Sequence, residues 1–300
     1  MKDSSPSTPP GSEVTDKKHE KVPVSHPQDS FALSEAEMFS QLPQAIGPSL
    51  FLDRFTLDEV HDRLASTSFL SAMVKKGIFN PRLEMLCVEP DEHRLIVFDD
   101  SGPDPVKMIE LRLALTRLGI PAAMGSSSSK SLFEMLAINW AMMQNPRAAF
   151  SAERPQLPGQ EHPGLGLGRK CHEFLVRLGG ELRRDGLINH PQYIHNAIIY
   201  RDEYYFIDPL RQGELLAMVR DLARYPIDVV SHAIAEGKLV DVQRQIRVNW
   251  VPEVMVCPLH KRLSSYFEGR EYREAVQKSL SSRSYDLSIQ LGEPAGMDEG

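Results

Sequence analysis

Three glycines alternate with leucines in residues 163–170, PGLGLGRK, and this run constrains the fold more than any other feature of the chain. Glycine lets a backbone turn sharply and approach other groups closely. Residues 171–184 follow with apolar side chains at the spacing of one helix face. The sequence therefore predicts a tight turn that leads into a helix. The free N–H groups at such a helix start favour an anion, for example a phosphate.

The glycine run departs from the two commonest nucleotide-binding motifs. A Rossmann fingerprint needs GxGxxG directly after a buried strand, whereas this run reads GxGxG and follows the proline-rich residues 151–163. The GK[ST] ending of a Walker A loop is also missing. These departures argue against both motifs. A nucleotide-binding enzyme is therefore only the third of the three functions that we consider.

Composition excludes several classes of protein. A net charge of −7 over 300 residues argues against a general nucleic-acid binder, which usually shows a basic face. The sequence contains no apolar run near the roughly 20 residues that span a bilayer, and the polar N-terminus lacks the apolar stretch of a signal peptide. Cys87, Cys171 and Cys257 are far apart, as in a reduced protein without disulfides. We expect a cytoplasmic protein with no membrane or nucleic-acid partner.

The chain divides by composition into two tails and a central region. Residues 1–30 and 292–300 contain too few large apolar side chains to offset their ordering entropy, and we expect them to be disordered. Strand and helix patterns alternate over residues 31–291, which predicts a single α/β domain, with α+β left open. The expected sheet is mixed and largely antiparallel, with flanking helices.

Individual elements follow from local patterns. Thr56 is expected to cap a helix, and residues 83–89 and 94–99 to form a hairpin. Residues 106–118 are ambiguous between strand and helix. The remaining predictions are a helix over 34–39, a helix over 131–143, a strand over 186–189, a helix over 191–200, a strand over 204–208, helices over 214–224 and 227–236, a strand over 247–257 and helical segments over 259–280.

The order of elements over about residues 147–210 resembles the cofactor half of the GNAT-type N-acetyltransferase superfamily. That family has a glycine turn before a helix, then a short strand, an Asn and a Tyr on a helix, and another strand. Here Asn196, Tyr200 and the aromatic residues 204–206 are similar to the last three features. Glu161 stands where the family has Gln or Arg, and a proline-rich loop stands where it has a strand that pairs with pantetheine.

The resemblance implies a GNAT-like fold and an acyl-coenzyme A-dependent N-acyltransferase. Acetyl-coenzyme A or another acyl-coenzyme A would be the co-substrate, and no metal is expected. Tyr200 would protonate the leaving thiolate, and His195 is a candidate base. The acceptor would be an amine of a small molecule or a protein. The residues assigned to the cofactor are Gly164, Gly166, Gly168, Arg169, Lys170 and Asn196.

Other interpretations remain open. The same scaffold would also suit a non-catalytic ligand sensor or a protein-interaction module, and a homodimer is not excluded. His190 and His195 are five residues apart and do not share a helix face, so no metal pair is predicted. Cys171 lies near a helix start, where the pKa of a thiol is lowered, but it lacks an evident partner base.

Overall fold

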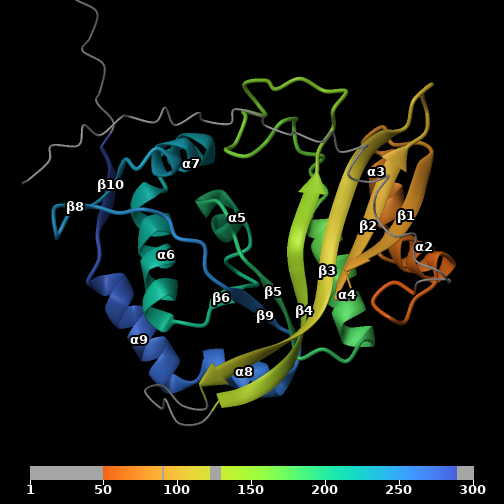
Figure 1. Cartoon of the computed structure of the whole chain (residues 1–300). Helices are drawn as coiled ribbons and strands as arrows, with labels where there is room; N and C mark the ends of the chain where they lie inside the picture. Colours follow the sequence, from red (N-terminus) through yellow and green to blue (C-terminus); the bar gives the residue numbers. More distant parts are fainter. Residues whose placement is uncertain (1–49, 90, 122–129, 289–300) are drawn as a thin grey trace, which may run out of the picture. The chain divides into compact units, whose positions relative to one another are not determined.

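A seven-stranded sheet is the main element of the computed structural model, with strand order β1-β2-β3-β4-β5-β9-β6 (Figure 1). Neighbouring strands are antiparallel except β4 and β5, which are parallel. The sheet therefore confirms the prediction of a mixed, mostly antiparallel arrangement. Its strands are β1 (Pro81–Glu89), β2 (Glu92–Asp99), β3 (Val106–Pro121), β4 (Lys130–Met143), β5 (Gly186–Asn189), β6 (Tyr205–Phe206) and β9 (Met255–Pro258).

The structure describes residues 50–89, 91–121 and 130–288, all within the unit Gln44–Gly300. The helix predicted over 34–39 and the two predicted tails lie outside these residues. A second sheet has the order β10 (Tyr285–Leu287), β7 (Leu239–Asp241) and β8 (Ile246–Arg247). The helices of the described residues are α2 (Leu57–Ser66), α3 (Phe69–Val74), α4 (Gly168–Glu181), α5 (Ile194–Ile199), α6 (Pro209–Leu222), α7 (Ile227–Ala235), α8 (Lys261–Glu268) and α9 (Arg270–Ser281).

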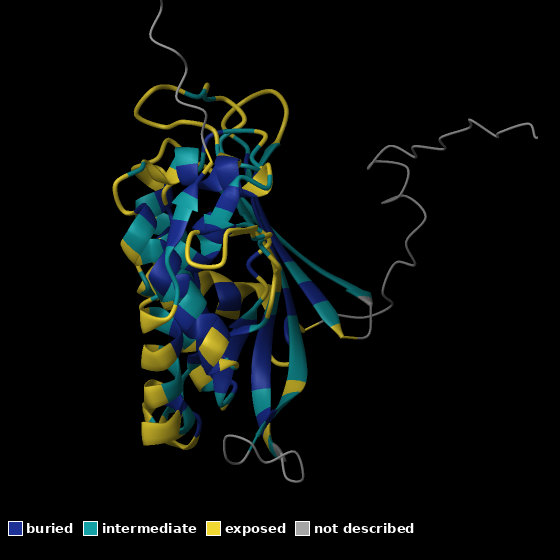
Figure 2. Ribbon diagram, turned by 90° about the vertical axis from the view of Figure 1, so that its left-hand side faces the viewer, coloured by how far each residue is buried: buried dark blue, intermediate teal, exposed yellow. Residues whose placement is uncertain are grey.

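Helices cover both faces of the seven-stranded sheet. On one face, Phe174 of α4 packs in the same apolar cluster as Leu136 of β4. On the other face, Leu263 of α8 packs in a cluster with Ala137 and Ile188. Figure 2 shows buried residues concentrated along the strands and on the inner sides of the helices. None of the helices formed by the described residues is long and apolar enough to cross a membrane.

Several local predictions are confirmed. Thr56 caps α2, and its hydroxyl accepts from the Glu59 backbone N–H while the Glu59 carboxylate accepts from the Thr56 N–H. This reciprocal pairing is a capping box. The hairpin of β1 and β2 forms as expected, and Asp208 caps α6 through the N–H of Leu210.

The helix predicted over residues 131–143 is wrong, because this segment is strand β4. Its Leu, Met, Ala and Glu residues are helix formers, and their apolar run carries no period-two alternation. Helices pack on both sides of β4, so Phe133, Met135, Leu136 and Ala137 are all buried. A strand buried on both faces reads as a continuous apolar run. Thirteen residue pairs with β3 outweigh the local helix preference.

The long strand predicted over residues 247–257 is also wrong, because β8 ends at Arg247 and β9 begins at Met255. Pro252 interrupts the segment and has no N–H to donate. Side chains from elsewhere hold the connection. The Trp250 indole donates to the Pro191 carbonyl at 3.0 Å, and the Arg211 guanidinium donates to the Val251 carbonyl at 2.8 Å.

Candidate functional site

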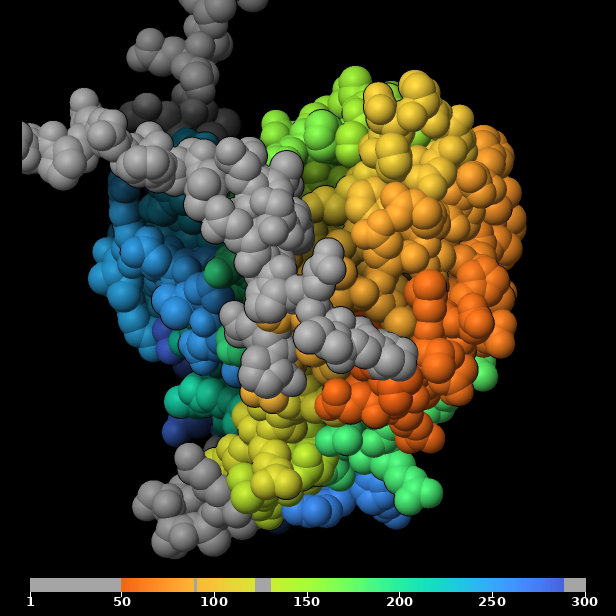
Figure 3. All heavy atoms as spheres, turned by 45° about the vertical axis from the view of Figure 1, so that its right-hand side comes forward, coloured from red at the N-terminus to blue at the C-terminus, as the bar shows by residue number. Residues whose placement is uncertain are grey.

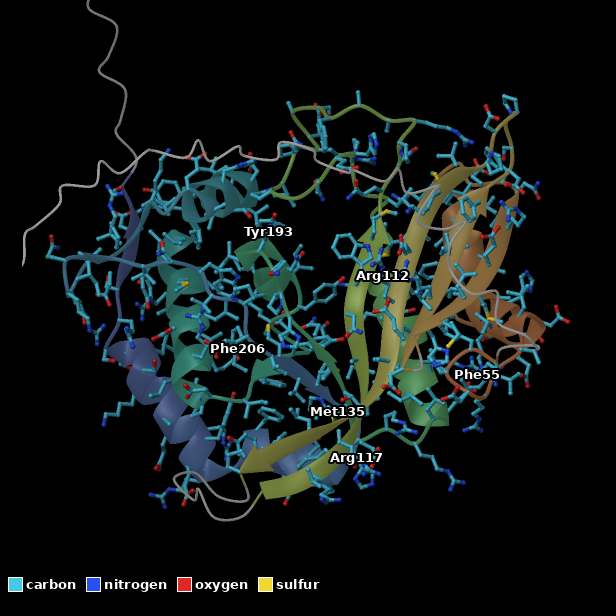
Figure 4. The ribbon with its side chains drawn as sticks, viewed as in Figure 1. Phe55, Arg112, Arg117, Met135, Tyr193 and Phe206 are labelled. Atoms are coloured by element: carbon cyan, nitrogen blue, oxygen red, sulfur yellow. The ribbon has the colours of Figure 1, made fainter. Side chains whose placement is uncertain are left out.

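The two parallel strands β4 and β5 pair over only four residues and then separate. Their register runs from Met135 opposite Gly186 to Ile138 opposite Asn189. Met135, labelled in Figure 4, marks the paired stretch. Beyond it β4 continues to Met143, while β5 ends at Asn189. We call this opening the fork, formed by residues 138–143 and 189–190.

A β-bulge lies at the fork. Arg112 of β3 pairs with Trp140, whereas the next residue, Leu113, pairs with Ile138, so Asn139 is an extra residue on β4. A bulge leaves backbone groups outside the regular ladder, and bulges are frequent beside active sites. At the end of β5, the Asn189 side-chain oxygen is buried and has no hydrogen-bond partner among the described residues. The fork therefore brings together polar backbone and side-chain groups that the regular ladder does not satisfy.

The glycine run begins directly at the end of β4. The Leu165 N–H donates to the Met143 carbonyl at 3.0 Å, and the Asn145 N–H donates to the Pro163 carbonyl at 2.9 Å. Gly164 forms a bridge with Gln144. The proline-rich residues 146–162 thus leave the strand end and return to it. In space, residues 163–165 pair antiparallel with the end of β4, so the glycine run borders the edge of that strand.

The last two glycines form an open turn before α4. Gly166 has a φ of +68°, a left-handed conformation that favours glycine. A Cβ placed on Gly166 would lie 3.5 Å from Nζ of Lys76, which follows α3. A Cβ placed on Gly168 would lie 3.0 Å from the hydroxyl oxygen of Tyr200. The turn therefore brings together a lysine, a tyrosine and the free N–H groups at the start of α4.

The two cations that follow the glycines differ in their contacts. Arg169 is exposed and forms no ion pair or side-chain hydrogen bond within the described part of the chain. Lys170 is paired with Glu173 on the next turn of α4, at 2.5 Å. The Lys76 ammonium, like Arg169, has no ion pair with another described residue. Lys76 and Arg169 are thus the cations free to bind an anion at this turn.

Tyr200 lies at the C-terminal end of α5 and is partly buried. Burial raises the pKa of its hydroxyl to about 12, with smaller contributions from Cys171 and Glu203. The hydroxyl forms no hydrogen bond with another described residue. The rings of His172 and Tyr204 surround it, with centroids 6.2 Å and 5.9 Å from that of Tyr200. Tyr200 is therefore a fixed, protonated donor beside Gly168.

His195 and Asn196 lie in the first turn of α5. His195 is buried, its Nδ1 is 2.6 Å from the Ser231 hydroxyl of α7, and its ring stacks on Tyr193, which Figure 4 labels. Burial lowers the pKa of His195 to about 4, with a smaller effect of His232. None of these contacts involves the glycine turn. The Asn196 carbonyl accepts from the Tyr200 N–H at 3.4 Å, which links this turn to the tyrosine.

Cys171 is not an activated thiol, contrary to the expectation from its position near a helix start. Its side chain is fully buried in the first turn of α4, and burial raises its pKa to about 12. Cys171 and Cys257 both act as core residues.

A cavity of about 400 Å³ lies at the fork, on the sheet face opposite α4. Ala114, Ala137 and Ile188 lie side by side across β3, β4 and β5 and form its apolar wall. Its other lining residues are Asp91, Leu115, Thr116, Ile138, Asn139 and His190. The cavity thus lies beside the paired end of β5, and the glycine segment pairs with β4 further along the same strand, at Met143 and Gln144.

Sequence reasoning missed Lys76, Asn139 and Asp91, and it predicted no role for His190 at this site. Lys76 is 90 residues before Gly166 in the sequence, so no local pattern connects them. Asn139 was placed in a helix, which hid its position at the bulge. His190 was considered only as a metal ligand.

Comparison of the sequence with known protein families finds no family model that matches, and no curated protein matches the chain.

Proposed function

We propose that this protein is an acyl-coenzyme A-dependent N-acyltransferase with a GNAT-like fold. The observation that carries the proposal is the opening between β4 and β5 with the glycine turn at its edge. The turn supplies what a pyrophosphate needs: an approachable backbone at Gly166, helix N–H groups, and two unpaired cations, Lys76 and Arg169. Lys170, bound to Glu173, contributes less in this interpretation.

The fork suits the pantetheine arm of such a cofactor. Between Ile138 and Met143, where the glycine segment begins to pair with β4, none of the described strands pairs with β4 on the side that faced β5. An amide-containing arm would bind the backbone of this stretch as a further strand does. The thioester would then lie near the bulge at Asn139, between the glycine turn and the cavity. Backbone groups freed by a bulge are suited to stabilise the oxyanion of acyl transfer.

Tyr200 supplies the proton for the leaving group. The amine nitrogen forms a bond to the thioester carbonyl carbon, the C–S bond breaks, and the thiolate takes the Tyr200 hydroxyl proton. The amine loses one proton to a base, and Tyr200 is reprotonated from solvent. Tyr200, whose pKa burial raises to about 12, is protonated at neutral pH, as a general acid must be. His195, with its low pKa and buried contacts, fits the role of base less well.

Thermal and chemical unfolding with acetyl-coenzyme A tests the binding half of the proposal. At 100 times its dissociation constant the ligand should stabilise the chain by about 2.7 kcal/mol. Lys76→Ala and Arg169→Ala should each weaken binding about tenfold or more, because each removes a charge-assisted bond to the pyrophosphate. Lys261→Ala, a change of an exposed lysine on α8, is the matched control. The proposal is contradicted if acetyl-coenzyme A does not stabilise the wild type, or if it stabilises both Lys76→Ala and Arg169→Ala as much as the wild type.

Turnover separates an enzyme from a non-catalytic sensor on the same scaffold. Release of coenzyme A in the presence of an amine should fall by about a hundredfold or more in Tyr200→Phe, while acetyl-coenzyme A still binds. A chain that binds the cofactor but releases no coenzyme A with any amine would instead be a sensor.

A further inference from the structure

The cavity at the fork has a carboxylate at one end and an imidazole at the other. Asp91 lies in the turn between β1 and β2, and His190 follows directly after β5. Neighbouring strands lie about 4.8 Å apart, so β2 and β5 are about 14 Å apart across β3 and β4. The side chains occupy part of that distance, and the wall between them is formed by Ala114, Ala137 and Ile188. The space fits a short aliphatic chain with a polar group at each end.

The charges at this cavity favour a cation. Asp91 is exposed and forms no ion pair or side-chain hydrogen bond with any residue in the described ranges. Its neighbour Glu92 is different, because it accepts from Arg94 Nε at 3.2 Å and from Asn139 Nδ2 at 3.3 Å. Of the described residues, those that line the cavity include no lysine or arginine. The cavity therefore presents one uncompensated negative charge, which repels a carboxylate ligand and attracts an ammonium group.

His190 is placed to act on a second amine at the other end. His190 comes two residues after Ile188 and lines the same cavity, on the same face of the sheet. It lies beside the opening between β4 and β5. Its ring has no hydrogen-bond or ion-pair partner among the residues that the structure describes. Histidine is the most frequent general base in enzymes. An amine held at His190 would lie at the fork, next to the proposed thioester.

We propose that this cavity binds an aliphatic diamine as the acyl acceptor, and the assignment of the acceptor role rests on the proposed function. One ammonium group pairs with Asp91. The other amine gives a proton to His190 as its nitrogen forms the bond to the thioester carbonyl carbon. The C–S bond breaks, and the sulfur takes the proton of Tyr200. The products are a mono-N-acyl diamine and free coenzyme A, so no oxidant or further reactant is required.

Binding of three probes tests the ligand class without any need for turnover. The probes are 1,5-diaminopentane, free lysine, which adds a carboxylate to the same carbon chain, and pentylamine, which lacks the second amine. Calorimetric titration of the full chain should give a dissociation constant for the diamine at least tenfold lower than for either of the other two. In Asp91→Asn the diamine should bind no better than pentylamine. Asp104→Asn, which changes an exposed carboxylate in the loop between β2 and β3, should bind like the wild type.

Kinetics then separates the two ends of the cavity. With the diamine as acceptor, Asp91→Asn should raise KM about tenfold, and His190→Gln should lower kcat about a hundredfold or more with little change in KM. Equal affinity for the three probes, or an unchanged diamine preference in Asp91→Asn, overturns the assignment of a diamine. If the diamine preference holds but acetyl-coenzyme A does not bind, the proposed function fails while the ligand class of the cavity stands.

Discussion

Acid should weaken the fold through His195, which is buried between Tyr193 and α7. Burial lowers the pKa of His195 from its ordinary 6.5 to about 4. As the pH falls, His195 therefore takes up a proton in the unfolded chain before it does so in the folded chain. The free energy that the neutral His195 contributes to folding is fully present above pH 6.5 and is lost as the pH falls from 6.5 to 4. At about 1.4 kcal/mol for each pKa unit, the whole contribution is about 3 kcal/mol, of which about 2 kcal/mol is lost by pH 5.

Urea denaturation of the wild type and of His195→Gln at pH 7 and pH 5 measures this effect. The wild type should lose about 2 kcal/mol more than the variant between the two pH values. Burial also lowers the pKa of His93 and of His172, but both residues are present in both proteins, so the difference isolates His195. Equal losses in the two proteins would refute the buried, neutral state of His195.

Three further changes test other parts of the structure. Gly166→Ala should destabilise the chain by about 1 kcal/mol, because the left-handed backbone at this position disfavours a side chain. Gly180→Ala should stabilise the chain by up to about 1 kcal/mol, because Gly180 is an exposed helical residue and its added Cβ would meet nothing within 4 Å. Urea denaturation measures both changes, and the same sign for both would contradict this prediction. Thr56→Ala should cost about 1 kcal/mol in the same assay, because it removes the capping box of α2, and an unchanged midpoint argues against that role. Cys171, with its pKa raised to about 12 by burial, should react with a thiol reagent only after unfolding, so rapid labelling of the native chain is the opposing result.

Much of the fold could be predicted from local patterns, and the largest error, at β4, has a long-range cause. Thr56, the β1–β2 hairpin and α4 carry signals in consecutive residues, and all three form. The segment of β4 was assigned to a helix because its residues prefer a helix. Its long pairing with β3 and its burial from both sides depend on residues far away in the sequence. In Figure 3 the yellow-green residues at the bottom of the molecule, in the colour range of β3 and β4, lie against blue residues in the colour range of α8.

The candidate site was predictable only where its residues are close in sequence. The glycines and Arg169 were found because they are consecutive, and Tyr200 because it follows in an expected order. Lys76, Asp91 and His190 reach the site through chain folding: Lys76 from the end of α3, Asp91 from a hairpin turn, and His190 from the end of β5. None of the three stands in a motif. The pairing of residues 163–165 with the end of β4 spans a proline-rich loop, so local sequence patterns do not show it.

The most direct measurement for the proposed acyltransferase is a calorimetric titration of the full chain with acetyl-coenzyme A and with S-acetyl-pantetheine. The two ligands share the thioester and the pantetheine arm, but only the first carries the pyrophosphate. If the glycine turn, Lys76 and Arg169 hold that pyrophosphate, acetyl-coenzyme A should bind at least tenfold more tightly, and Arg169→Ala should reduce the difference. Equal affinity for the two ligands, or no binding of acetyl-coenzyme A, would contradict the account.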